Sequence, residues 1–494
     1  MCMPFKGIAL PGVFIAFMAG TSVADEASLV ERLQLATDRA EQENCKSSLA
    51  VLNDVVSEKA FAALPEEKRL SVFELANWYA AEANDNGAKY RYALEGTRLS
   101  GASEYIWHTR FALEMNDERY AAVAETLEAM TRANRAALNA LKIEWLARLN
   151  RKLRDNGDTL LQARVLQVLT DNDYRPADFL LTGDNFKLSY AEILAEQGKT
   201  AEATALLERV VEPQPLIGAS VDRRLRALVK PDFDARAIVE ARLAQMRDIA
   251  VAHPGSMAAV LEMADYLRQL GRPEETLATL EAAHPDRVYA VTFSDLDDNR
   301  NWWWDSLSKT YAMLGRDDEA VSAMGKAGAI SERGELNVSQ ALNLGHLQLE
   351  LGKPAEALET VSVFDDGKRT MSPYGEMVLR LVRGCALLAL GRAEVAKPDL
   401  AYAASHEKDH PSAAMTLPLC AGDMDAAAAV LIRRLDSPDQ HVGALLQFSD
   451  YDPPPVGPPF KGLYARLPEL KARADVQAAI ARAGGVRRFH LQYQ

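Results

Sequence analysis

The segment with the clearest potential for chemistry runs from His406 to His410 and reads HEKDH, which matches the H-E-x-x-H pattern of zinc-dependent hydrolases. In that pattern two histidines one helical turn apart bind the same zinc ion, and the glutamate activates water. The chemistry therefore requires one helix through both histidines. Here Pro411 follows His410 directly, and a residue before a proline is driven out of helical geometry. We interpret the segment as a polar connecting loop and keep a zinc hydrolase at His406 and His410 as an alternative.

Two other groups have the residue types of a site without its full pattern. Asp295, Asp297 and Asn299 begin like a calcium-binding loop, but the glycine that should come next is an arginine and the twelfth residue is not a glutamate. Such residues are more typical of the start of a helix. Ser306 and Lys309 have the spacing of a serine acyl-transfer pair, but the companion motifs S-D-N and K-T-G are missing. The sequence thus predicts a protein that is not an enzyme, with no catalytic residue, no metal and no cofactor.

The helices that would position these residues are indicated by a short phrase that recurs from residue 197 onward. Its copies are QGKTAEA at 197–203, LGRPEET at 270–276, LGRDDEA at 314–320, LGKPAEA at 351–357, LGRAEVA at 390–396 and AGDMDAA at 421–427, with turn glycines Gly198, Gly271, Gly315, Gly352, Gly391 and Gly422. From Gly271 onward, successive glycines lie 31 to 44 residues apart. A period of this length is typical of stacked supersecondary units.

Each copy has the residues of a helical hairpin. Apolar residues at helical spacing precede the glycine, as Leu307, Tyr311 and Leu314 do ahead of Gly315. Glycine favours the left-handed conformation that ends a helix, and in two copies a proline follows at the position where a second helix would begin. A small residue such as Ala320 stands five positions after each glycine, where two antiparallel helices must approach closely.

These units resemble tetratricopeptide repeats. The copy at 301–334 has the family's signature residues at Trp304, Leu307, Ser308, Tyr311, Gly315, Ala320 and Ala327, and the copy at 184–217 has Tyr190, Ala191, Gly198, Ala203 and Pro215. The unit ending at Gly422 departs from the pattern, because Pro418 lies inside its first helix, which should be kinked or short. The resemblance implies an all-α fold, a right-handed α-solenoid of tetratricopeptide-like helical hairpins.

The rest of the chain is less regular. Residues 25–183 are helical by periodicity but lack the phrase, so we predict degenerate hairpins that continue the solenoid, with a separate helical bundle as the alternative. Residues 184–450 hold the clear repeats. Residues 451–494 begin with a proline-rich linker, which cannot continue a helix, and go on to a helix and a short tail. We predict that this segment caps the open end of the solenoid.

The first residues indicate export. One lysine is followed by an apolar stretch and then by small residues ahead of Asp25, which is the order of a secretory signal peptide. The stretch is too short to span a bilayer, which takes roughly 20 apolar residues. We predict that residues 1–24 are a signal peptide cleaved after Ala24. The protein should then be periplasmic or secreted, with no stable membrane insertion after cleavage.

Composition limits which classes of partner the chain can bind and which state its cysteines can adopt. The formal net charge is −14, and the sequence has no basic cluster, so phosphate backbones are repelled and we predict no nucleic-acid partner. Cys385 and Cys420 fall on the first helices of consecutive units. An exported protein permits a disulfide between them, but the sequence does not say whether their Cα atoms are close enough. Two buried thiols are the default expectation.

In tetratricopeptide repeats the first helix of each hairpin lines a concave groove, and the resemblance implies which residues face it here. They are Leu261, Asp265 and Arg268, then Trp302, Asp305 and Lys309, then Leu342, His346 and Leu349. Trp304 takes the packing position, which leaves Trp302 without an obvious core role. We predict that Trp302 holds an apolar side chain while the cations Arg268, Lys309 and His346 meet a carboxylate, such as a peptide C-terminus. The alternative is that Trp302 packs against the connection 285–300.

These observations lead to one functional hypothesis with two alternatives. We expect a non-catalytic scaffold of the cell envelope that binds a protein or peptide in the concave groove of its repeats. The identity of that partner is not encoded in any motif. Because a fold does not determine a function, a purely architectural subunit of an envelope assembly and the zinc-dependent hydrolase stay open as alternatives.

Overall fold

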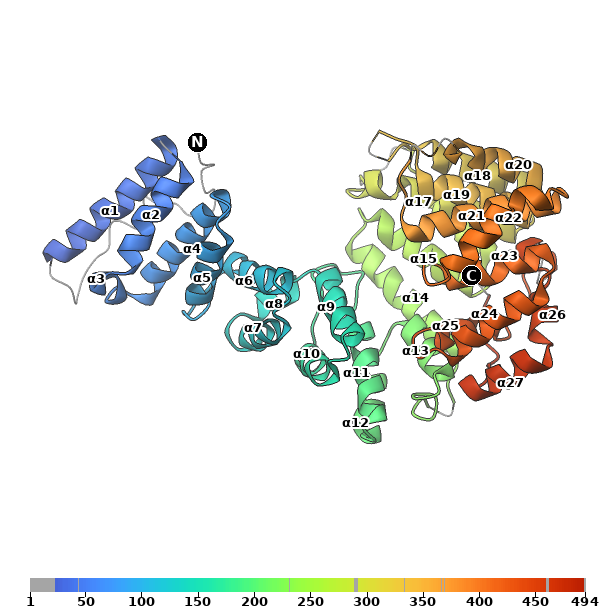
Figure 1. Cartoon of the computed structure of the whole chain (residues 1–494), viewed down its shortest axis with the longest axis horizontal. Helices are drawn as coiled ribbons and strands as arrows, with labels where there is room; N and C mark the ends of the chain where they lie inside the picture. The colour runs from blue at the N-terminus through green and yellow to red at the C-terminus, as the bar shows by residue number, and fades with distance from the viewer. Residues whose placement is uncertain are drawn as a thin grey trace. The chain divides into compact units, whose positions relative to one another are not determined.

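The computed structural model describes residues 23–42, 44–230, 232–287, 292–332, 334–365, 367, 369–458 and 462–492. Within these ranges every regular element is a helix, and pairing of extended residues is limited to two isolated bridges. The predicted all-α helical-repeat solenoid is therefore confirmed (Figure 1). The predicted signal peptide, residues 1–24, lies almost wholly outside the described residues. None of the described helices has both the length and the apolar composition that a membrane span requires.

The chain divides into two compact units, residues 1–193 and 194–494. Helices of the first unit pack mainly as consecutive pairs. They are α1 (Val23–Gln42), α2 (Cys45–Val56), α3 (Lys59–Ala62), α4 (Glu66–Glu82), α5 (Asn86–Gly96), α6 (Glu104–Asn116), α7 (Tyr120–Ala133), α8 (Arg135–Ala140), α9 (Ile143–Asp155) and α10 (Thr159–Asp171). The boundary between the units falls within α11 (Asp184–Glu196).

Hairpins of the first unit lack the repeated phrase but keep its left-handed turn. Asn84, Glu118 and Gly157 have φ angles of 55°, 55° and 71° in the turns α4–α5, α6–α7 and α9–α10. Asparagine and glycine tolerate this conformation, whereas glutamate adopts it at a cost. Trp107 and Phe111 of α6 are fully buried and anchor the core of this unit.

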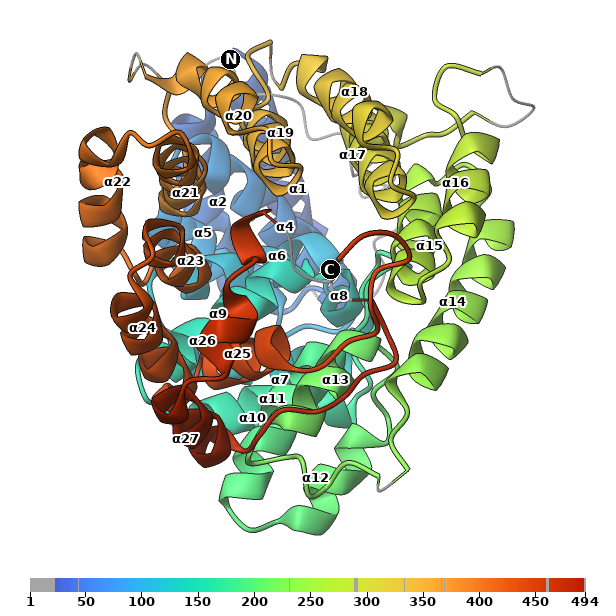
Figure 2. The ribbon, with the colours of Figure 1, turned by 90° about the vertical axis from the view of Figure 1, so that its right-hand side faces the viewer.

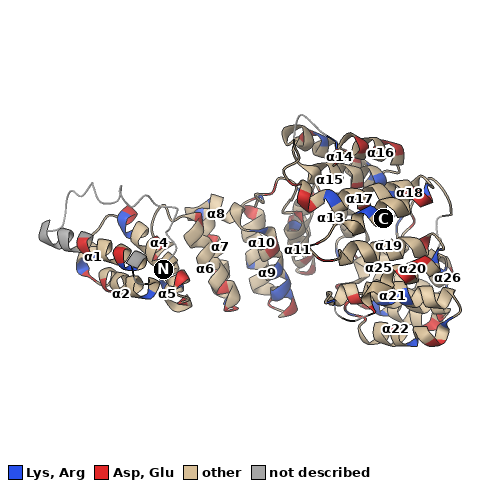
Figure 3. Ribbon diagram, turned by 90° about the horizontal axis from the view of Figure 1, so that it is seen from above, with Lys and Arg blue, Asp and Glu red and all other residues tan. Residues whose placement is uncertain are grey.

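The second unit contains the clear repeats. Its helices are α12 (Thr200–Leu207), α13 (Pro213–Val221), α14 (Ala235–Ala252), α15 (Met257–Gln269), α16 (Pro273–Ala282), α17 (Leu296–Met313), α18 (Asp317–Ala329), α19 (Val338–Glu350), α20 (Pro354–Val361), α21 (Pro373–Ala389), α22 (Ala393–Ser405), α23 (Pro411–Ala421), α24 (Met424–Asp436), α25 (His441–Phe448), α26 (Leu467–Lys471) and α27 (Ala474–Ala483), with the 3-10 turns η2 (Ser362–Phe364) and η3 (Gly462–Tyr464). Acidic and basic residues are interspersed along the helices of both units (Figure 3).

Turn glycines and small residues shape the hairpins of the second unit. The six glycines of the repeated phrase have φ angles between 70° and 80°, the left-handed conformation in which a residue with a side chain is strained. Ala320 and Ala357 are fully buried, and the Ser308 hydroxyl donates to the Ala320 carbonyl at 2.7 Å. A Cβ on Gly345 would lie 2.9 Å from the side chain of Val361. Helices of one hairpin therefore approach closely because small residues stand at their contact.

The C-terminal clasp, meaning the described residues from 449 to 492, returns across the second unit (Figure 2). α27 packs on α24, the second helix of the last hairpin. The N–H of Phe489 donates to the carbonyl of Asp450 at 2.8 Å, and the N–H of Gln492 donates to the carbonyl of Gln269 at the end of α15 at 2.7 Å. α13 also packs on α25. The start and the end of this unit are therefore in direct contact.

Candidate functional site

Three consecutive tryptophans near the middle of α17 have different surroundings. Trp303 is fully buried, and its indole N–H donates to the carbonyl of Leu280 at 3.1 Å. Trp304 lies against Trp303, with ring centroids 4.8 Å apart, and against the ammonium group of Lys326 at 4.4 Å. Trp302, by contrast, keeps 42% of its surface exposed. α17 therefore presents one large aromatic ring to solvent.

The charged residues predicted to face the groove on α17 are joined to each other and to the next hairpin. Asp305 is buried, and its Oδ2 lies 2.7 Å from Lys309 Nζ. Its Oδ1 accepts a hydrogen bond from Asn343 Nδ2 on α19 at 3.1 Å. The Lys309 side chain is nevertheless 55% exposed. Trp302 and Lys309 are thus the members of this predicted set that α17 offers to solvent.

On α15 the predicted residues mostly contact one another. Arg268 is buried, and its Nη2 lies 2.9 Å from Asp265 Oδ1. The same guanidinium donates to the Ser306 hydroxyl on α17. Asp265 Oδ2 accepts from Gln269 Nε2 at 2.8 Å, and Leu261 packs partly buried against the core. Arg268 therefore links α15 to α17, the first helices of two consecutive hairpins. Its guanidinium already has an ion-pair partner and a hydrogen-bond partner within these helices.

The predicted residues of α19 lie beside the C-terminal clasp. Leu342 and Leu349 are buried. His346 Nε2 lies 3.3 Å from the Glu350 carboxylate and 3.2 Å from the hydroxyl of Tyr464, which belongs to the clasp. Part of the surface that the sequence assigns to a partner is thus covered by the chain's own C-terminal segment.

The clasp approaches the first helices at their C-terminal ends. Gly462 has a φ of 52°, and a Cβ there would lie only 2.6 Å from the Cα of Glu350 on α19, so glycine is required at this close approach. Arg466 Nη1 donates to the carbonyl of Leu419 on α23 at 3.4 Å. The last carbonyls of a helix have no intrahelical partner, and that of Gln269 at the end of α15 accepts its hydrogen bond from Gln492 of the clasp. Sequence analysis missed this role.

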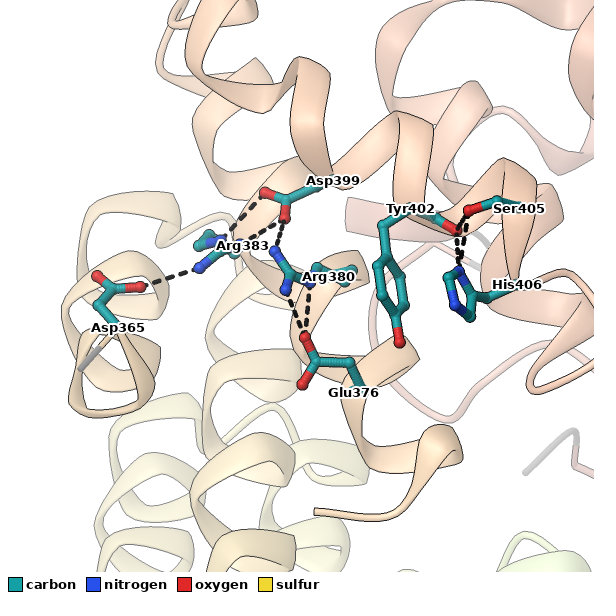
Figure 4. Close-up of polar contacts among 8 residues, drawn as sticks. All are labelled: Asp365, Glu376, Arg380, Arg383, Asp399, Tyr402, Ser405 and His406. Carbon is teal, nitrogen blue, oxygen red and sulfur yellow. Dashed lines mark hydrogen bonds and ion pairs between the residues drawn. The ribbon is translucent and has the colours of Figure 1, made fainter. Parts of the chain in front are cut away.

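The HEKDH segment does not form one helix. α22 ends at Ser405 and α23 begins at Pro411, so His406 and His410 stand at the ends of different helices. His406 stacks on Tyr402 with ring centroids 3.8 Å apart, and its Nδ1 lies 3.0 Å from the carbonyl of Tyr402 (Figure 4). The proline breaks the helix as expected, because it removes helical geometry from the residue before it.

His410 is engaged on the other side of this break. Its ring stacks on Tyr374 with centroids 4.4 Å apart, and its Nδ1 accepts a hydrogen bond of 3.5 Å from the N–H of Ala413, which caps α23. Burial, together with the positive charges of Arg434 and His346, lowers the pKa of His410 to about 4. His410 is therefore a neutral helix cap at physiological pH.

Glu407, the residue that would activate water in a zinc hydrolase, also has a partner of its own. Its carboxylate forms a two-point ion pair with the Arg433 guanidinium, with one N–O distance of 3.2 Å. In the part of the chain that the structure describes, no group of three or more His, Cys, Asp or Glu side chains is placed to hold a metal ion. Glu407 and both histidines of the segment are therefore each engaged by another side chain.

An ion-pair network centred on the buried carboxylate of Asp399 joins the two helices of the α21–α22 hairpin. Asp399 of α22 accepts hydrogen bonds from Arg380 Nη1 at 3.1 Å and from Arg383 Nη2 at 2.6 Å, both on α21 (Figure 4). Arg383 also pairs with Asp365 at 3.0 Å, and Arg380 donates to Glu376 at 2.8 Å. The hydrogen bond to Asp399 raises the pKa of Arg383. Every charge in the network has a partner, so its role is structural.

Asp295, the first residue of the calcium-like sequence, caps a neighbouring helix. Its two carboxylate oxygens accept hydrogen bonds from the N–H groups of Met257 at 2.7 Å and Ala258 at 3.0 Å, in the first turn of α15. A carboxylate at this end of a helix also interacts favourably with the helix dipole. The capping role expected from the sequence is present, but on α15 rather than on the helix that follows Asp295.

Cys385 and Cys420 form a disulfide, with an S–S distance of 2.05 Å and a Cα–Cα distance of 5.4 Å. The default expectation of two buried thiols is therefore wrong. The bond joins α21 and α23, the first helices of consecutive hairpins. Its formation depends on how closely those helices pack, which residue spacing along the chain does not determine.

A buried acid–histidine pair that sequence analysis missed joins α13 to α25. Asp222 and His441 are each 1% exposed, and Asp222 Oδ1 lies 3.4 Å from His441 Nε2. Arg224 also pairs with Asp222 at 2.7 Å. Burial by itself raises the pKa of Asp222, but hydrogen bonds from His441 and Arg224 outweigh it and hold the pKa well below its usual range. Residues so distant in sequence leave no local pattern that would reveal the pair.

No family model matches the chain, and no curated protein matches it in sequence. Among solved structures, the Cut9–Hcn1 hetero-tetramer of the APC/C is similar at 14% identity over 92% of this chain and 90% of that chain, with a TM-score of 0.29. The Naa15/Naa10 complex bound to HypK-THB is similar at 13% identity over 85% and 70%, with a TM-score of 0.23. The TPR domain of P58(IPK) is similar at 14% identity over 80% and 98%, with a TM-score of 0.22. At these identities the likeness concerns the helical-repeat fold alone.

Proposed function

We propose that this chain is a non-catalytic scaffold of the cell envelope that binds a protein or peptide along the first helices of its second unit. An array of hairpins offers an extended surface to which each repeat contributes a few side chains. The residues with complete hydrogen-bond and ion-pair partners, such as Arg268 and Asp399, support the array itself. Binding is assigned to residues that the array leaves exposed.

The observation that carries the proposal is the exposure of Trp302. Its neighbours Trp303 and Trp304 are packed, yet Trp302 keeps 42% of its surface open. Lys309 stands two helical turns further along the same face of α17, with a side chain that is 55% exposed. Tryptophan is among the residues that dominate the energetics of protein interfaces. In this proposal Trp302 contacts an apolar side chain of the partner, and Lys309 forms an ion pair with a carboxylate of the partner.

Export is the second part of the proposal. Disulfides persist in oxidising compartments and are rare in the cytosol, so the bond between Cys385 and Cys420 supports it. The order of residues 1–24 supports it independently. N-terminal sequencing of the protein from its native host should begin at Asp25, in the envelope or secreted fraction. A chain that begins at Met1 in the cytosolic fraction would contradict export.

The binding surface is tested with the double change Trp302→Ala and Lys309→Ala. The full-length protein is cross-linked in native cells, and the stoichiometric partner is identified and quantified. We expect the double change to reduce capture of that partner about tenfold or more, since removal of a central aromatic anchor costs about 2 kcal/mol or more. The far-ultraviolet circular-dichroism spectrum should be unchanged, because Trp302 is exposed and because Asp305, which loses its ion pair with Lys309, keeps its hydrogen bond from Asn343.

A matched control comes from the first unit, where Trp145 is 38% exposed and the Lys152 side chain is 45% exposed. The change Trp145→Ala with Lys152→Ala should leave capture intact. Capture that survives the change at Trp302 and Lys309 would show that the surface is assigned wrongly. About one equivalent of zinc in the purified protein, lost on His406→Ala, would instead favour the hydrolase alternative.

A further inference from the structure

Three arginines gather where the turn after α13 meets the segment after α27, wholly within the second unit. The Nη1 of Arg226 lies 3.4 Å from the position that a Cβ on Gly484 would take and 3.7 Å from that of Gly485. The Cβ of Arg223 is 3.5 Å from the same Gly484 position. Arg487 follows two residues after Gly485. We call Arg223, Arg226 and Arg487 the arginine cluster.

The carboxylates nearest to the arginine cluster in sequence already form ion pairs with other residues. Asp222 pairs with Arg224 at 2.7 Å and with His441 at 3.4 Å. Asp450, whose backbone pairs with that of Arg487, forms its side-chain ion pair with Lys471 at 2.6 Å. Within the described ranges, no Asp or Glu carboxylate forms an ion pair with a member of the cluster. The cluster is therefore a local concentration of positive charge in a chain whose formal net charge is −14.

Arg487 lies in a partly desolvated place. The side chain of Arg487 is half-buried, and its guanidinium lies over the ring of Phe233 with 5.9 Å between the Cζ and the ring centroid. Burial and the positive charge of Arg226 lower the pKa of Arg487. A lowered pKa means that the folded chain disfavours the charged form of this side chain. A bound anion would relieve both the repulsion and the desolvation.

Two glycines stand beside the Arg226 guanidinium. Gly484 and Gly485 have φ angles of 124° and 83°, and neither has a side chain to cover the Arg226 guanidinium. A guanidinium offers planar, paired N–H donors that match the oxygens of phosphate.

From this geometry we propose that the arginine cluster is a binding site for a phosphate group, carried by inorganic phosphate or by a small phosphomonoester. The positive charge of Arg226 and Arg487, neither of which has an ion pair with a carboxylate within the described residues, suits a dianion better than a single carboxylate. The ligand would bridge residues 223–226 and 484–487, which come from the start and the end of the second unit. The site is separate from the Trp302 surface and does not depend on it.

The test uses thermal unfolding of the full-length protein in inorganic phosphate, with chloride replaced at constant ionic strength. Because a ligand that binds only the folded state stabilises it, we expect the midpoint to rise with phosphate and to follow a saturating curve. The change Arg226→Gln with Arg487→Gln should weaken the apparent affinity about tenfold or more, since charge-assisted hydrogen bonds are lost. In phosphate-free buffer this variant should be at least as stable as the parent, because the repulsion is removed.

The matched control removes two exposed arginines of α9, by Arg148→Gln with Arg151→Gln, and should keep the full response to phosphate. A separate titration with glycerol phosphate distinguishes the two sources, and the ligand that saturates at the lower concentration is assigned as the natural class. The proposal is overturned if the variant of the arginine cluster responds as the parent does. It is also overturned if acetate raises the midpoint as much as phosphate, or if the rise with phosphate never saturates.

Discussion

Single polar residues in this chain are held in place by partners from neighbouring helices as well as from their own helix. Asp305 accepts a hydrogen bond from Asn343 of the next hairpin. Arg268 donates one to the Ser306 hydroxyl on α17, the first helix of the next hairpin. Burial of a charge without such partners would be strongly unfavourable. The same logic explains why His410, which has lost much of its hydration, is kept neutral rather than charged.

We expect His410 to make the stability of the chain depend on pH. Its pKa is about 4 in the folded chain, against about 6.5 for an unperturbed histidine. Between these values the unfolded state binds a proton that the folded state does not, so the free energy of unfolding falls as the pH falls from about 6.5 to about 4. The loss should be about 1–2 kcal/mol, a value reduced for the partial exposure of the ring.

Urea unfolding at pH 7 and pH 4.5 measures this loss. His410→Asn should reduce the change in midpoint between the two values, because asparagine can cap α23 without titrating in this range. His253→Asn, which replaces an exposed histidine, is the matched control and should behave as the parent does. An unchanged pH dependence in His410→Asn would show that other groups are responsible.

At the scale of helices, the hairpin is the feature that the sequence reveals. A turn needs a left-handed residue, and a close contact needs a small one, so Gly315 and Ala320 can be recognised from a few neighbouring letters. The roles of Arg268 and Asp305 could not be recognised, although the helices that carry them were predicted. Their burial is decided by Ser306 and by other side chains one repeat away, which no local spacing encodes.

The disulfide and the path of the clasp could not be predicted from the sequence for the same reason. Cys385 and Cys420 bond because α21 and α23 pack closely, and the clasp reaches α19 because Gly462 allows a close approach. In the sequence the clasp begins as a proline-rich stretch, which excludes a helix but does not say where the chain goes next. Long-range contacts of this kind follow from the assembled fold and not from a motif.

Contacts within a hairpin can be tested by overpacking them. Ala320 and Ala357 are fully buried where the helices of their hairpins meet. We expect Ala320→Leu and Ala357→Leu each to lower the free energy of unfolding by about 1–3 kcal/mol, because a larger side chain forces the helices apart. Ala355→Leu is the matched control on α20, where the residue is exposed, and should change it by about 0.5 kcal/mol or less. Unchanged urea midpoints in both buried variants would show that the repeat register is wrong.

At the scale of the whole molecule, the second unit differs from an open solenoid, in which each repeat contacts only its neighbours. Its ends meet through α13 and α25, through the buried pair of Asp222 and His441, and through the clasp. A contact between distant parts of the chain couples the stability of the repeats that lie between them. Destabilising the end of the unit should therefore also lower the stability of the helices at its start.

We expect Phe489→Ala to show this coupling. Phe489 is 2% exposed, and its ring lies 5.6 Å from that of Tyr451 inside the clasp. Loss of the ring should destabilise the second unit by about 3–5 kcal/mol, as is usual for a buried phenylalanine. Hydrogen exchange should become faster not only in α27 but also in α13 and at the end of α15, where Gln492 binds the carbonyl of Gln269.

Hydrogen exchange resolved by segment separates coupling from a local effect. Val456→Ala changes a residue of the same clasp that is 52% exposed, so it should alter the exchange of α13 little and the stability by about 0.5 kcal/mol or less. If Phe489→Ala speeds exchange in α27 alone and leaves α13 as protected as in the parent, the clasp is a cap on the last hairpin and does not couple the two ends. If exchange rises in α13 and α15 together, the clasp sets the stability of the first repeats of the unit from the far end of the chain.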